Sequence, residues 1–154
     1  MNETDFLKNF EQRMKCVGRY TVLCSNSFDK KLWKEYGIET RDEQMNMLFT
    51  LLLFIMEYSL REENCTIDEI AAFVGDISYE YYAHRLNFEQ SRDFARFMVE
   101  DILGNGGSSM YFKAFDYEKR TYKDINIRYI DNKVVYLDSG VRRTSYYLTD
   151  EGYN

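Results

Sequence analysis

The chain has no proline, a single histidine and no long apolar run. Without proline, no Pro-rich linker divides its 154 residues and no cis-proline turn can be proposed. The most apolar run, Met47–Met56, is too short to span a bilayer and fits a buried central helix. The amino terminus is acidic and polar, unlike a signal peptide. We therefore expect a cytoplasmic globular protein without membrane contact.

Catalytic and metal chemistry have few candidate residues. Nothing in the sequence brings a cysteine close to His84, so no nucleophile–histidine pair is indicated. Cys16, Cys24 and Cys65 form no C-x₂₋₄-C knuckle, so we infer no zinc site and expect reduced thiols. The glycine-rich segment 104–109 follows a helix and precedes a strand, whereas a phosphate loop needs the reverse order. We predict no enzymatic activity, no cofactor and no small-molecule substrate.

What the chain does contain is an uneven charge and many aromatic residues. The net charge is −6, and counting Lys and Arg against Asp and Glu gives +2 for residues 1–38, −9 for residues 39–108 and +1 for residues 109–154. There are 14 Tyr and 11 Phe. Because aromatic side chains are large, both the core and any binding face are expected to depend on them.

Apolar periodicity and capping residues predict a helical first part. An apolar stripe predicts a helix over residues 3–17, ended by Gly18, followed by a short strand or buried connector over residues 19–23. Ser27 is expected to cap a second helix that closes at Gly37. Capping-box patterns then predict three helices, starting at Thr40 and running to about Arg61, at Thr66 to Gly75, and at Asn87 to Gly104–Gly107. Segment 77–85 is a helical turn or a loop.

After Gly107 the apolar period changes from 3.6 to 2, which predicts strands. The expected strands are 111–115, 125–129, 134–137 and 143–148. Asp131-Asn132 and Asp138-Ser139-Gly140 are expected to form tight turns. The fold class predicted is α+β, with an antiparallel sheet of three or four strands after the helices.

This order of elements resembles a bacterial winged helix-turn-helix. The stretch Thr66–Val74 is similar to the helix before the recognition helix, and Tyr147-Leu148-Thr149-Asp150-Glu151-Gly152 is similar to the junction that closes the wing. The sequence also resembles the amino-terminal part of uncharacterised winged-helix proteins, some of them similar to condensin-like complex subunits. The resemblance implies a helical extension over residues 1–38 and a winged-helix domain over residues 39–154.

Winged helices commonly bind DNA through the third helix and the wing, and phosphate contacts need cations. The candidate DNA-contacting residues are Arg92, Arg96, Lys119, Arg120, Lys123, Arg142 and Arg143. The acidic middle segment opposes that use, because the two arginines of the third helix alternate with acids. The alternative is protein contact, for which the candidate anchors are Tyr79, Tyr81, Tyr82 and Tyr146. We favour a protein partner or a second copy of the chain over DNA.

The last residues carry a helix start signal. Thr149 is placed to cap a helix whose first turn holds Asp150 and Glu151. We therefore expect this sequence to be the front part of a longer protein. We also expect an apolar patch, left exposed near the last strand and the first helices, that a second copy could cover.

Overall fold

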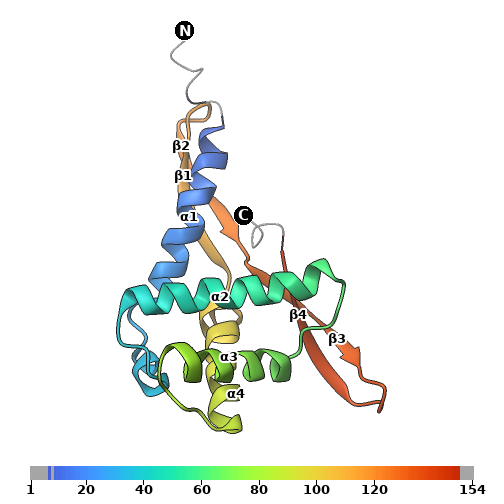
Figure 1. Cartoon of the computed structure of the whole chain (residues 1–154). Helices are drawn as coiled ribbons and strands as arrows, with labels where there is room; N and C mark the ends of the chain where they lie inside the picture. Colours follow the sequence, from blue (N-terminus) through green and yellow to red (C-terminus); the bar gives the residue numbers. More distant parts are fainter. Residues whose placement is uncertain (1–6, 8, 150–154) are drawn as a thin grey trace.

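A computed structural model describes residue 7 and residues 9–149. The helices and strands follow one another in an α+β order (Figure 1). The elements are α1 (Phe10–Ser27), η2 (Lys31–Tyr36), α2 (Arg41–Leu60), α3 (Ile67–Tyr81), α4 (Phe88–Arg96), η3 (Phe97–Leu103), η4 (Asn105–Gly107), β1 (Met110–Asp116), β2 (Thr121–Ile127), β3 (Ile130–Tyr136) and β4 (Arg142–Leu148). The predicted α+β class is confirmed.

Three helices begin at the predicted capping boxes. The Thr40 side chain accepts a hydrogen bond from the Glu43 amide, and the Glu43 carboxylate accepts one from the Thr40 amide, each at 3.1 Å. Asn87 and Gln90 form the same reciprocal pair at the start of α4. The box at Thr66 is also present and opens α3. Each box satisfies backbone amides that have no partner within the first turn of the helix.

The first helix continues well past the predicted end. α1 passes through Gly18 to Ser27, so the strand or connector expected over residues 19–23 is wrong. Gly18 is buried against the Phe112 ring, and a Cβ atom there would lie 2.3 Å from a ring carbon. The glycine therefore serves close packing. Ser27 ends α1 instead of capping the next helix, which is the 3₁₀-helix η2; Gly37 closes η2 with φ of 81°, as predicted.

α3 also outlasts its predicted end. It continues through Gly75 to Tyr81, so the expected stop at Gly75 is wrong. A Cβ atom on Gly75 would lie 2.8 Å from the Ser91 hydroxyl oxygen of α4, so this glycine allows α3 and α4 to approach. Part of segment 77–85, left open between helical turn and loop, belongs to α3, and residues 82–87 connect α3 to α4.

Four strands form, but as two separate antiparallel hairpins. β1 pairs with β2, and β3 pairs with β4, with no pairing between the two sheets among the described residues. The single sheet of three or four strands is therefore not observed. Asp131 and Asn132 lie within β3, so the turn predicted there is wrong. The turn around Gly140 is confirmed, with φ of 80°.

The core lies between α2 and the elements around it. Leu48, Leu51 and Ile55 of α2 are fully buried, whereas Phe49 and Leu53 are 47% and 57% exposed. The Met47–Met56 segment is thus central but is not buried on every side, because the side chains of its outer face are exposed to solvent. Figure 1 shows the two hairpins diverging: β1–β2 runs beside α1, and β3–β4 extends away from the helices.

The β3–β4 hairpin is fixed to the helices at its base. The Tyr146 amide donates to the Cys65 carbonyl at 2.8 Å, and the Cys65 amide donates to the Ser145 hydroxyl at 2.9 Å. The Leu148 amide donates to the Ser59 hydroxyl at 3.2 Å. Thr66 and Ser145 form an isolated antiparallel bridge. The segment that connects α2 to α3 therefore pairs with the outer edge of β4.

Candidate interaction surfaces

The structure divides the predicted DNA-contacting cations between separate places. Lys119 and Arg120 lie in the turn between β1 and β2, and Lys123 lies on β2. Arg142 and Arg143 belong to the other hairpin, and Arg92 and Arg96 belong to α4. Figure 1 shows the two hairpins pointing in different directions, so the cations of the β1–β2 hairpin lie apart from those of the β3–β4 hairpin, whereas Arg92 and Arg143 both approach Asp68.

Several of these cations lie beside carboxylates. The Arg92 guanidinium is 3.5 Å from one Asp68 oxygen, and the Arg143 guanidinium is 3.9 Å from the other. Lys123 forms an ion pair with Glu11 of α1 at 2.6 Å, and this contact raises the pKa of Lys123. Carboxylates this close reduce the positive potential that a phosphate would experience.

The four candidate tyrosines have different environments. Tyr79 and Tyr81 are 56% and 73% exposed on α3, where a partner could reach their rings. Tyr82 packs against the core, and burial raises the pKa of its hydroxyl. Tyr146 is buried, with only 8% exposed, so its ring completes the core, contrary to an anchor role. The structure therefore leaves two of the four available as anchors.

A groove lies between α3 and α4. It has a volume of about 340 Å³; its lining includes Ala72, Gly75, Tyr79, Leu86 and Phe88. The small residues Ala72 and Gly75 of α3 lie beside two large exposed rings, those of Tyr79 and Phe88, and Phe88 is 63% exposed. The Arg85 guanidinium lies 5.0 Å from the centre of the Tyr79 ring. Sequence reasoning missed Phe88, although its position directly after the Asn87 cap was a signal of an exposed first turn.

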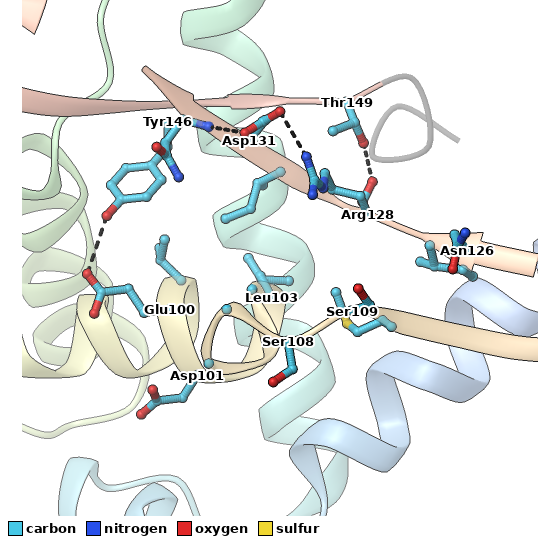
Figure 2. A pocket seen from close by; sticks show the side chains of 18 of the residues that line it. Glu100, Asp101, Leu103, Ser108, Ser109, Asn126, Arg128, Asp131, Tyr146 and Thr149 are labelled. Atoms are coloured by element: carbon cyan, nitrogen blue, oxygen red, sulfur yellow. Dashed lines mark hydrogen bonds and ion pairs between the residues drawn. The ribbon is translucent and has the colours of Figure 1, made fainter. Parts of the chain in front are cut away.

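A larger cleft opens where the two hairpins separate. Its volume is about 1070 Å³, and it is bordered by η3, η4, the start of β1, the end of β2 and both strands of the β3–β4 hairpin. Figure 2 shows Asp131 and Thr149 on one side of this hairpin cleft, with Leu103, Ser108 and Ser109 on the other. The glycine-rich segment is a helix end and turn, as expected, and it also lines this cleft.

A π-helical stretch forms one wall of the hairpin cleft. In η3 the Gly104 amide donates to the Val99 carbonyl at 2.9 Å, five residues earlier. The stretch presents Glu100 and Asp101 side by side at the surface, while Phe97, Met98, Ile102 and Leu103 stay buried. π-Helical turns are rare and frequently occur at functional sites.

Two contacts organise the polar groups of the cleft. The Tyr146 hydroxyl donates to the Glu100 carboxylate at 3.4 Å, and burial together with this carboxylate raises the pKa of Tyr146. Arg128 pairs with Asp131 at 3.2 Å, and both interactions are drawn in Figure 2. The charged residues that line the cleft are Glu100, Asp101, Asp131 and Arg128, which gives 1 − 3 = −2. The cleft is acidic.

The thiols differ in exposure. Cys16 is exposed, Cys24 is partly buried and Cys65 is buried, and all three are free. Burial raises the pKa of Cys65 to about 12, so its thiol stays protonated at neutral pH. Within the described residues, no group of three or more His, Cys, Asp or Glu side chains is arranged to hold a metal ion.

No helix within the described part of the chain combines the length and the apolar character needed to span a membrane.

The chain was compared with protein-family models, curated protein sequences and solved structures, and no significant match was found in any of the three comparisons.

Proposed function

We propose that this chain is a non-catalytic winged-helix module that makes protein–protein contacts, or dimerises, within a larger cytoplasmic bacterial protein. The order of α2, α3 and α4 before the β3–β4 hairpin supports a winged-helix arrangement. The bridge between Thr66 and Ser145 supports it further, because it joins the segment before α3 to the hairpin that would be the wing. The β1–β2 hairpin is then an addition between the third helix and the wing.

The observation that carries the proposal is the groove between α3 and α4. It is lined by apolar and small side chains, with Tyr79 and Phe88 exposed beside it. Asp76 and Arg85 are the charged residues of its lining. Exposed aromatic rings around a shallow groove are typical anchors for a protein partner. A phosphate backbone would instead need several unpaired cations there.

DNA binding is the second candidate, and a specific observation favours it. Lys119 and Arg120 lie exposed at the turn of the β1–β2 hairpin, and Arg142 is exposed near the tip of the other hairpin. Two cationic hairpin tips could contact backbone phosphates on either side of a groove. Such binding would not need the α3–α4 surface to be basic.

A titration of labelled duplex DNA, followed by fluorescence anisotropy across a salt series, separates the two functions. We expect weak binding at low salt that disappears at physiological salt, because few phosphates would be neutralised. Submicromolar binding at physiological salt, with a steep salt dependence and a loss in the Arg120→Glu variant, would favour the DNA-binding function instead.

Site-specific photocrosslinking tests protein contact directly. A photoreactive phenylalanine analogue is placed at Tyr79 and, as a matched control, at Tyr122, which is similarly exposed but lies on the β1–β2 hairpin. We expect a discrete protein adduct in cells for position 79 that is lost on adding Phe88→Ser, and no such adduct for position 122. Equal labelling at both positions would contradict a specific role of the α3–α4 groove.

A further inference from the structure

Among the described residues, one edge of the β3–β4 hairpin has no strand partner. The Leu137 amide donates to the Val141 carbonyl at 2.9 Å, and the strand register pairs Val135 with Arg143. In an antiparallel pair, hydrogen-bonded and non-hydrogen-bonded positions alternate. Val135 and Lys133 therefore bond to β4, whereas the backbone groups of Val134 and Tyr136 point outward from β3. No other strand in the described part of the chain pairs with that edge.

The opposite edge of the same hairpin is occupied at its base. Tyr146 and Leu148, which point outward from β4 by the same alternation, donate to the Cys65 carbonyl and the Ser59 hydroxyl. On the β3 side, the outward Asn132 amide is satisfied by the neighbouring Asp131 carboxylate at 2.8 Å. Beyond Asn132, Val134 and Tyr136 are 46% and 71% exposed. An unprotected edge carrying apolar side chains is a template for another strand.

The open edge leads into the acidic hairpin cleft. Ile130 and Asn132 line the cleft on the same face of the hairpin as Val134 and Tyr136, because alternate residues share a face. Glu100 and Asp101 lie across the cleft on η3. The surface along β3 therefore changes from acidic at the base of the hairpin to apolar near its tip. Lys133 projects from the other face.

We propose that the outer edge of β3 and the hairpin cleft together bind an extended segment of a partner protein, which adds as a third strand to the hairpin. Basic side chains of the segment, opposite Ile130 and Asn132, face Glu100 and Asp101. Apolar side chains, at alternate positions farther along, pack on Val134 and Tyr136. The inference rests on the proposed function of protein contact and specifies a second surface with its own ligand chemistry.

The chemistry of the surface selects this partner. Strand addition supplies affinity through backbone hydrogen bonds, and alternate side chains supply specificity. The −2 charge of the cleft lining opposes an acidic segment or a nucleic acid and favours Lys or Arg. The occupant is therefore an extended peptide that is basic in one half and apolar at alternate positions in the other.

Synthetic peptides provide the test. The probe is a short peptide with an acetylated amino terminus and an amidated carboxyl terminus. Arginine occupies alternate positions in one half, valine occupies alternate positions in the other half, and threonine fills the remaining positions. The peptide is made with its sequence in both chain directions. We expect binding in one direction, measured by anisotropy, and protection of the Val134 and Tyr136 amides from hydrogen exchange. Glutamate in place of arginine, or N-methylation of the pairing amides, should weaken binding by about tenfold or more.

Variants of the protein locate the site. Val134→Pro removes an outward amide and should abolish binding, whereas Arg142→Pro, which removes an outward amide on the β4 edge and does not line the cleft, should leave binding intact. The double change Glu100→Gln with Asp101→Asn should weaken the binding of the basic probe about tenfold. The control Glu57→Gln, which changes an exposed acid of α2, should leave that binding unchanged.

Equal binding of the N-methylated peptide, or unchanged amide protection, would overturn strand addition even if a proline variant failed to fold. Equal binding of the acidic peptide would overturn the assigned charge preference. Neither result bears on crosslinking at Tyr79, so the failure of this inference and the failure of the proposed function are distinguishable.

Discussion

At the scale of single residues, Gly18 shows how one missing side chain sets a packing distance. The Phe112 ring of β1 lies against the backbone of α1, where a Cβ would meet a ring carbon at 2.3 Å. In an exposed helix Gly→Ala would stabilise by about 1 kcal/mol. Here we expect Gly18→Ala to lower the free energy of unfolding by about 1–3 kcal/mol, measured by urea denaturation, because the ring and the helix must separate.

A double-mutant cycle separates the clash from any change in helix propensity. Combined with Phe112→Ala, which removes the ring, Gly18→Ala should become neutral or stabilising. If Gly18→Ala destabilises equally with and without the ring, the contact with Phe112 is not the cause.

The buried thiol of Cys65 makes a prediction about alkaline pH. Its pKa is raised from 9.0 to about 12 in the folded state. As the pH rises through 9, the unfolded chain loses the thiol proton while the folded chain retains it, so the free energy of unfolding falls from about pH 9 to pH 12. Cys65→Ala should reduce this slope, measured by denaturation at a series of pH values. An unchanged slope would contradict the assignment to Cys65.

At the scale of helices and strands, the capping boxes are local devices with testable energies. Thr40→Ala removes the acceptor of the Glu43 amide at the start of α2 and should lower the free energy of unfolding by about 1 kcal/mol. Adding Glu43→Ala should cost less than the sum of the single changes, because the two side chains act reciprocally.

Thr21→Ala is the matched control, since Thr21 is exposed inside α1 and caps nothing. Alanine is the better helix former, so denaturation should show no loss of stability. A loss equal to that of Thr40→Ala would mean that the cap contributes nothing specific.

The elements that sequence reasoning found correctly are those encoded locally. Thr40, Thr66 and Asn87 each start a helix through contacts with a residue three positions later, so a short window contains the whole signal. The false helix ends at Gly18 and Gly75 have the opposite origin. At each glycine a residue of another element packs against the backbone, Phe112 of β1 on Gly18 and Ser91 of the next helix on Gly75, and both residues lie outside the short window that reveals a capping box.

The candidate sites were harder to predict for the same reason. The two acids Glu100 and Asp101 were visible as a pair, but their relation to Asn132 depends on where the hairpins diverge. Likewise, Arg92 and Arg143 were predicted as phosphate contacts, and only the packing of α3 brings Asp68 to both of them. Tyr146 was assigned to a partner because side-chain alternation alone does not reveal which face of β4 is buried.

At the scale of the whole molecule, the junction of Cys65 with Ser145 closes a long loop. The Cys65 amide donates to the Ser145 hydroxyl across 80 residues of chain, so α3, α4, η3 and the β1–β2 hairpin all lie between its two ends. Closing such a loop costs conformational entropy before its contacts can compensate. The β3–β4 hairpin should therefore dock on the helices late in folding, after the transition state.

A kinetic experiment follows from this order of events. Ser145→Ala leaves the buried Cys65 amide without its acceptor, a loss of about 1–3 kcal/mol. We expect stopped-flow measurements to show faster unfolding with an almost unchanged folding rate, whereas Ser139→Ala, in the exposed turn, changes neither. A slowed folding rate would instead place the docking before the barrier. Late docking would also make the open edge of β3 one of the last parts of the chain to take shape.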